Sequence, residues 1–165
     1  MKAIITGSFD PITMGHIQII KKADEIFKEI YVVALINEKK EYMFTLEQKK
    51  ELMKDSLEEF GNVIIDAYEG MTAEYMHKNS ITKIVRGIRN DDDLKYEIEL
   101  ANKMKEFDSN FETILLKTED EYRNVSSSLV KEKIKSGESL VGLVHPKIEE
   151  KIKQMYLKNS KPHFD

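Results

Sequence analysis

Short apolar runs alternate with longer stretches of helical periodicity along the chain, and this alternation restricts the fold more than any other feature. The runs have the β-branched, largely apolar composition of strands that are covered on both faces. They lie at Ala3–Thr6, Tyr31–Ile36, Val63–Ala67, Lys83–Val85 and Thr113–Leu116. Strands separated by helices form repeated βα units. We therefore expect an α/β fold with a doubly wound, five-stranded parallel sheet and helices on both faces.

The stretches between these runs have the spacing of helices with one apolar face. The clearest start signal is Thr45 followed by Gln48, which has the spacing of a capping box and predicts a helix over Leu46–Phe60. The other helices are expected at 15–27, 72–78, 91–107, 127–135 and 146–157. In a doubly wound sheet the ligand binds at the carboxyl ends of the strands, so the loops after the strands should carry the chemistry.

A single domain accounts for the chain, because 165 residues suit one core and no repeat or flexible linker divides them. We expect a domain over residues 1–158 and a flexible tail over residues 159–165. No apolar run approaches the roughly 18 residues of a membrane span. The chain has no cysteine, which excludes disulfides and Cys-ligated zinc. With no secretory leader at its start, a cytoplasmic location is expected.

Arginine is scarce and unevenly placed. The formal net charge is -4, which argues against a nucleic-acid partner, and only three of the 26 basic residues are arginines. Two of them form an R-x-x-R pair, Arg86 and Arg89, where the fourth run ends. A guanidinium grips phosphate bidentately, so the pair is a candidate phosphate site. The alternative is a pair of surface ion pairs with Asp91–Asp93, and the scarcity of arginine elsewhere favours the phosphate site.

The loop after the first run, 7–16, is bounded by glycines and leads into a helix whose first turn holds His16. Backbone amides that are free at a helix start bind anions, and Gly7 and Gly15 would allow a ligand to approach closely. The loop is neither a Walker loop nor a G-x-G-x-x-G motif. The alternative is a structural loop with a capping histidine.

A second candidate phosphate cradle precedes the predicted helix 127–135. Three consecutive serines, Ser126–Ser128, follow the segment Tyr122–Val125. Serines at a helix start are either N-caps or phosphate ligands, and the segment alone does not decide between them. Lys40 lies in a charged loop after the second run, where a solvated charge run is the default interpretation.

The motifs in this order resemble the HxGH nucleotidyltransferase superfamily in its T-x-G-H form, here Thr13–His16. The pattern is similar to that of the bacterial phosphopantetheine adenylyltransferases over nearly the whole chain. The motifs that carry the resemblance are G-S-F-D-P-I-T-M-G-H, K-x-x-M-F-T from Lys40, R-G-I-R from Arg86 with Y-E seven residues later, and S-S-S-L-V-K.

The resemblance implies a Rossmann-like fold and the transfer of the adenylyl group of ATP to 4′-phosphopantetheine, which gives dephospho-coenzyme A and pyrophosphate. Magnesium would enter with the ATP phosphates, with no metal site on the protein. The resemblance also implies a homohexamer and makes coenzyme A a candidate feedback inhibitor. From the charge and the short apolar runs, neither nucleic acid nor a membrane is expected as a partner.

The same resemblance implies roles for individual residues. His16 would stabilise the transition state at the α-phosphate, and Lys40 and Arg89 would share the charge that develops toward pyrophosphate. The implied phosphopantetheine-binding residues are Ser8, Lys40, Thr72 and Arg86. The implied ATP-binding residues are Ser8, Phe9, His16, Gly87, Ile88, Arg89, Glu97, Tyr122, Arg123, Asn124, Val125, Ser126, Ser127 and Ser128.

Two other functions remain open. A related enzyme could transfer a cytidylyl or adenylyl group to glycerol phosphate, choline phosphate or nicotinate mononucleotide, although such relatives usually have histidine where this chain has Thr13. The second possibility is a regulatory module that binds a nucleotide but does not catalyse a reaction. The presence of His16, Lys40, Arg86 and Arg89 together argues against it.

Overall fold

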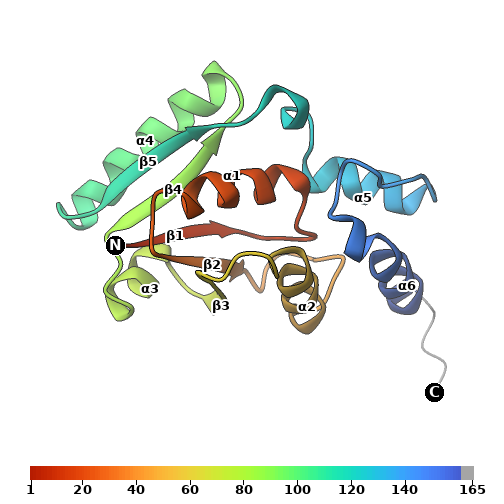
Figure 1. Cartoon of the computed structure of the whole chain (residues 1–165). Coiled ribbons are helices and arrows are strands. Elements are labelled where there is room, and N and C mark those ends of the chain that lie inside the picture. Colours follow the sequence, from red (N-terminus) through yellow and green to blue (C-terminus); the bar gives the residue numbers. More distant parts are fainter. Residues whose placement is uncertain (161–165) are drawn as a thin grey trace.

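The computed structural model describes residues 1–160. Of the predicted tail over 159–165, residues 161–165 lie outside the described residues (Figure 1). The strands are β1 (Lys2–Gly7), β2 (Glu29–Ile36), β3 (Val63–Glu69), β4 (Lys83–Ile88) and β5 (Glu112–Lys117). The helices are α1 (Met14–Asp24), α2 (Leu46–Ser56), α3 (Thr72–Lys78), α4 (Asp91–Phe107), α5 (Ser127–Lys135) and α6 (Glu149–Ser160), with 3-10 turns η1 (Asp120–Tyr122) and η2 (Pro146–Ile148).

The described strands form one parallel sheet in the order β3-β2-β1-β4-β5. This confirms the predicted doubly wound sheet. The chain first winds outward from β1 through β2 to β3, then crosses back to β4 and continues to β5. The order therefore reverses between β1 and β4, and a sheet of this topology binds its ligand at that switch point.

Side chains that alternate along each strand build a separate core on each face of the sheet. In β1, Ala3 and Ile5 belong to one cluster and Ile4 to the other. The first cluster packs residues of α1, α2, α5 and α6 against the sheet, and the second packs α3 and Phe111. Helices therefore cover both faces, as the sequence predicts (Figure 1).

The seam between β1 and β4 is short. β1 is in register with β2 along its whole length, from Lys2 opposite Glu29 to Gly7 opposite Ala34. Its register with β4 covers only Ala3 opposite Lys83 and Ile4 opposite Ile84. Beyond these pairs the carboxyl ends of the two strands are no longer paired with each other. The space between the strand ends is where a site can form.

The predicted capping box of α2 is confirmed, but its predicted end is wrong. Thr45 Oγ1 accepts from the Gln48 amide at 3.2 Å, and Gln48 Oε1 accepts from the Thr45 amide at 3.0 Å. The helix stops at Ser56, because Leu57 leaves the helical conformation with φ -112° and ψ 12°. Leu57 stays buried in this turn, so an apolar pattern that continues past the helix looks helical in the sequence.

The helices α1 and α6 also differ from their predicted ends. The helix expected over 15–27 runs from Met14 to Asp24, and the chain then turns while Phe27 remains in the core. The helix α6 continues through Asn159 and Ser160, which the sequence placed in the tail. Asn159 Nδ2 donates to the Met43 carbonyl at 3.1 Å, and this contact ties the end of the helix to the loop before α2. No helix within residues 1–160 is long and apolar enough to cross a membrane.

Candidate active site

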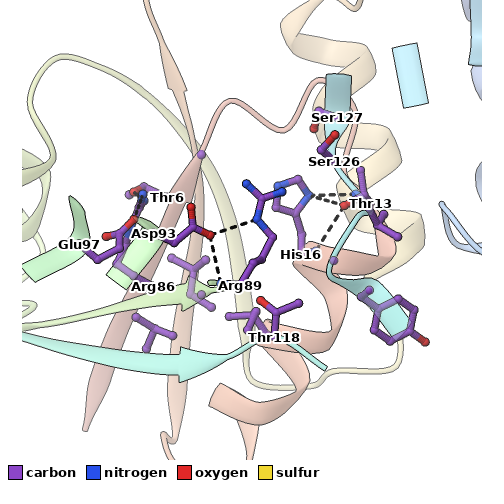
Figure 2. A pocket seen from close by; sticks show the side chains of 18 of the residues that line it. Thr6, Thr13, His16, Arg86, Arg89, Asp93, Glu97, Thr118, Ser126 and Ser127 are labelled. Carbon is purple, nitrogen blue, oxygen red and sulfur yellow. Dashed lines mark hydrogen bonds and ion pairs between the residues drawn. The ribbon is translucent and has the colours of Figure 1, made fainter. Parts of the chain in front are cut away.

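A cavity of about 440 Å³ opens at the switch point of the sheet (Figure 2). Its walls are the diverging ends of β1 and β4, the first turns of α1 and α4, and the segment that leads into α5. Segments far apart in the sequence therefore meet here. The predicted site residues that line it are Ser8, His16, Arg86, Gly87, Arg89, Glu97, Tyr122, Val125, Ser126 and Ser127.

His16 is held by a capping box at the start of α1. Thr13 is the N-cap residue, and its backbone amide donates to His16 Nδ1 at 3.0 Å. Because an amide N–H can only donate, Nδ1 is the acceptor and carries no proton in this bond. The ring proton of the neutral imidazole is therefore on Nε2, the ring atom available to a ligand in the cavity.

Burial lowers the pKa of His16 to about 4. The imidazole is therefore neutral at pH 7 and offers one N–H donor in place of a positive charge. The ring packs against Phe9, with the two ring centroids 4.8 Å apart. The structure confirms the capping interpretation and places His16 in the cavity wall, and anion binding by His16 stays a prediction.

Phe9 packs against the His16 ring and does not line the cavity. Its side chain is only 1% exposed, and its backbone has φ 45°, in the left-handed region. Gly15, next to His16 in the chain, lies against the segment before α5. A Cβ at Gly15 would lie 3.1 Å from the Val125 carbonyl oxygen, which is backbone and cannot easily move. The absence of a side chain lets the segment before α5 press against the start of α1.

Arg86 extends from β4 and is held by Glu97 of α4. Its Nε and Nη2 donate to the two Glu97 carboxylate oxygens, each at 2.9 Å, and its Nη1 donates to Thr6 Oγ1 at 3.5 Å. The Glu97 side chain is only 7% exposed. The structure thus places Glu97, which the resemblance implies as an ATP contact, in a bidentate pair with Arg86.

Arg89 is held by Asp93, a residue that the sequence analysis did not assign to the site. Asp93 Oδ2 accepts from the Arg89 backbone amide at 3.1 Å and from its Nε at 3.2 Å. The ion pair foreseen as the alternative interpretation therefore exists, yet Arg89 and Asp93 both line the cavity. The signal in the sequence was the spacing of four residues between them.

The hydroxyl groups of Ser126 and Ser127 already have protein partners. Ser126 is the N-cap of α5 and accepts from the Leu129 amide at 3.1 Å, and Ser127 donates to the Pro11 carbonyl at 2.9 Å. Ser126 thus acts as an N-cap, one of the two interpretations left open, and phosphate binding by its hydroxyl group stays a prediction. The predicted ATP-binding residues that do not line the cavity are Phe9, Ile88, Arg123, Asn124 and Ser128.

A second cavity, of about 610 Å³, adjoins the first. Both cavities include Thr6, Gly7, Ser8 and Arg86 in their walls. Lys40 lines the second cavity, so three of the four implied phosphopantetheine contacts meet there. Thr72, the fourth, begins α3 and is not among the residues that line either cavity, although Gly70, two residues before it, lines the second.

Asp10 joins the two loops that carry Ser8 and Lys40, and sequence reasoning did not single it out. Its fully buried carboxylate accepts from the Met43 amide at 2.8 Å and from the Phe44 amide at 3.0 Å. The only signal was its place in the F-D-P segment of the glycine-bounded loop. Within residues 1–160, no three His, Asp or Glu side chains gather in a way that could hold a metal ion.

The structure resembles solved structures in fold. One of them is a proposed nicotinate-nucleotide adenylyltransferase from Vibrio parahaemolyticus, with a TM-score of 0.74 and 15% sequence identity over 97% of this chain and 96% of that one. The two chains thus share an α/β fold over nearly their whole lengths.

Membership of a family follows from the sequence itself. A family model described as cytidylyltransferase-like matches residues 4–133, a range that contains every predicted site residue. The chain belongs to the cytidylyltransferase-like family and is a nucleotidyltransferase.

Proposed function

We propose that this enzyme transfers the adenylyl group of ATP to 4′-phosphopantetheine and releases pyrophosphate. The observation that carries the proposal is the wall shared by the two cavities, which includes Ser8 and Arg86. Two substrates bound on either side of that wall would bring a phosphate of each to the same place. This arrangement suits a direct reaction between ATP and a phosphorylated acceptor.

The proposed reaction does not require general acid–base catalysis. An oxygen of the acceptor phosphate forms a bond to the α-phosphorus of ATP, and the bond from that phosphorus to the bridging oxygen breaks. The electron pair leaves with pyrophosphate. Because the nucleophile is already an anion, it needs no general base, and catalysis consists of positioning and of neutralising charge.

Three side chains would supply these effects. His16 would donate its Nε2 proton in a hydrogen bond to an α-phosphate oxygen. Arg89 would neutralise the departing pyrophosphate, and Lys40 would meet the acceptor phosphate from the second cavity. A neutral histidine suits the α-phosphate because it donates without a proton having to be taken up first.

Magnesium would arrive as part of the substrate Mg-ATP. Both carboxylates that line the first cavity are engaged by arginines, Asp93 by Arg89 and Glu97 by Arg86. These residues do not offer the free carboxylates of a dedicated magnesium site, whereas the phosphates of a nucleotide do. We therefore derive no step from a metal held by the protein.

The choice of 4′-phosphopantetheine as acceptor is supported by the order and spacing of the sequence motifs and by Thr13. Thr13 occupies the first position of the H-x-G-H pattern, where it caps α1 and orients His16. The principal competitor is nicotinate mononucleotide, which also presents a phosphate to ATP. The two acceptors differ in the part beyond the phosphate, so a substrate comparison separates them.

The test is pyrophosphate release from Mg-ATP with 4′-phosphopantetheine, nicotinate mononucleotide or glycerol phosphate as the acceptor, repeated with CTP. We expect release only with ATP and phosphopantetheine. Release with another acceptor would refute the proposed specificity. Nucleotide binding without release under any condition would refute the proposed activity.

The variant His16→Ala tests the mechanism in the same assay. We expect turnover to fall by about 10²–10³-fold, the usual effect of removing one transition-state donor. His145→Ala is a matched control, because His145 Nδ1 also accepts from a backbone amide, that of Lys147 at 3.1 Å, but outside both cavities. Near-normal turnover of folded His16→Ala would contradict the role of His16.

A further inference from the structure

We infer that Asp93 is a positioning residue that holds the guanidinium of Arg89 ready for the pyrophosphate end of the nucleotide. The inference rests on the proposed function only in that a triphosphate occupies the first cavity. It does not depend on which acceptor the enzyme uses.

The ion pair between Arg89 and Asp93 uses only the Nε side of the Arg89 guanidinium. Asp93 Oδ2 accepts hydrogen bonds from the backbone amide of Arg89 at 3.1 Å and from its Nε at 3.2 Å. Within residues 1–160, Nη1 and Nη2 of Arg89 have no hydrogen-bond partner. A guanidinium held through Nε presents both Nη groups together, which is the fork that binds two phosphate oxygens.

These free groups point into the cavity. Figure 2 shows the guanidinium of Arg89 beside the imidazole of His16, with Asp93 on the opposite side of the arginine. A phosphate chain that meets His16 at its α-phosphate would therefore meet Arg89 further along. Asp93 stays clear of that path.

Asp93 is itself fixed by the start of α4. Its backbone amide donates to Oδ1 of Asn90, the N-cap residue, at 2.9 Å. Asp93 and Glu97 are four residues apart, on one face of the helix, and each holds one arginine of the R-x-x-R pair. One face of α4 thus orients both arginines. Asp92 is exposed and, within the described chain, pairs with no side chain.

Holding Arg89 in place should matter because its side chain is 41% exposed and long. An arginine that is already ordered loses less rotamer freedom when it binds phosphate. The negative charge of Asp93 acts in the opposite sense, since it repels a nucleotide. A positioning role requires the first effect to exceed the second, and this can be measured.

The experiment is calorimetric titration of pyrophosphate into the full-length protein, together with steady-state kinetics for Mg-ATP. We expect Asp93→Ala to weaken pyrophosphate binding by about 3–10-fold, the range of one side chain left unordered. The control Asp92→Ala removes the same charge from the same helical turn and should change binding by less than twofold. Asp93→Asn keeps one acceptor oxygen and should recover part of the affinity.

The double variant shows whether Asp93 acts through Arg89. In an Arg89→Ala background, Asp93→Ala should cause no further loss, whereas two independent contacts would give losses that multiply. Tighter pyrophosphate binding by Asp93→Ala would mean that charge repulsion dominates and would overturn the inference. So would an effect equal to that of Asp92→Ala, or one that persists without Arg89.

The readouts also keep this inference apart from the proposed function. Pyrophosphate binding is measured without turnover, so a wrong acceptor leaves the comparison of variants intact. If wild-type protein binds neither pyrophosphate nor Mg-ATP, the proposed function fails and the inference fails with it. Thermal unfolding of Asp93→Ala and Asp92→Ala in parallel shows whether a loss of binding comes from a loss of stability.

Discussion

Replacing Asp10 with alanine should destabilise the protein and loosen the second cavity at once. The Asp10 carboxylate is fully buried and accepts from the amides of Met43 and Phe44. Lys131 Nζ lies 3.5 Å from the same carboxylate. Alanine would leave both amides without their acceptor and the ammonium of Lys131 without its counterion.

The expected loss follows from these contacts. A buried donor that loses its partner costs about 1–3 kcal/mol. Phe44 is buried and Met43 is half-buried, so two donors suggest about 3–4 kcal/mol of unfolding free energy. Burial lowers the pKa of Lys49 and the nearby Asp10 raises it, so the loss of Asp10 should lower the pKa of Lys49 further. That change adds to the destabilisation in the same direction.

Urea unfolding followed by circular dichroism measures the effect. Asp120→Ala is the control, because Asp120 is exposed and its nearest cation, Arg123 Nη1, is 3.8 Å away. We expect the control to change stability by less than about 0.5 kcal/mol, as surface substitutions usually do. A loss below about 1 kcal/mol for Asp10→Ala would refute the argument, since neither amide would then depend on the carboxylate. Asp10→Asn keeps one acceptor and should fall between the two.

Two further predictions concern His16 and assembly. The pKa of His16 is lowered to about 4 in the folded protein, whereas it is about 6.5 in the unfolded chain. Between these two pH values the unfolded state therefore binds more protons than the folded state. The free energy of unfolding should fall by about 2–3 kcal/mol as the pH drops from 6.5 to 4. His16→Gln should remove that part of the slope in urea titrations, and an unchanged slope would contradict the lowered pKa. The sequence motifs imply a hexamer by resemblance, so light scattering should give about six times the 19.2 kDa of one chain, and a monomeric mass would refute the expected assembly.

The positions of the strands could be predicted well, because apolar runs mark buried strands directly. Their ends could not. In the sequence the fourth apolar run stops at Val85, where polar Arg86 follows, but β4 continues to Ile88. Arg86 lies opposite Leu115 and Gly87 opposite Leu116 in the ladder with β5. Pairing with a neighbour thus extends a strand beyond the point where its own composition identifies it.

The members of the site could be predicted, but not how they support one another. Sequence spacing singled out both arginines, and the structure brings both to the cavity. It did not show that Glu97 and Asp93 hold them, because this depends on which face of α4 meets the sheet. The reach of Asp10 to Phe44 crosses 34 residues, a contact that only the assembled fold creates.

The short seam between β1 and β4 has a consequence for how the protein should move. The sheet is divided at this seam into a part with β3, β2 and β1 and a part with β4 and β5, joined by register at only Ala3–Lys83 and Ile4–Ile84. Amide hydrogens next to the seam should exchange with solvent faster than those between β1 and β2. A nucleotide that bridges His16 and Arg89 would link the two parts and slow that exchange. The bound nucleotide would then connect the two parts of the sheet at the place where β1 and β4 are not paired with each other.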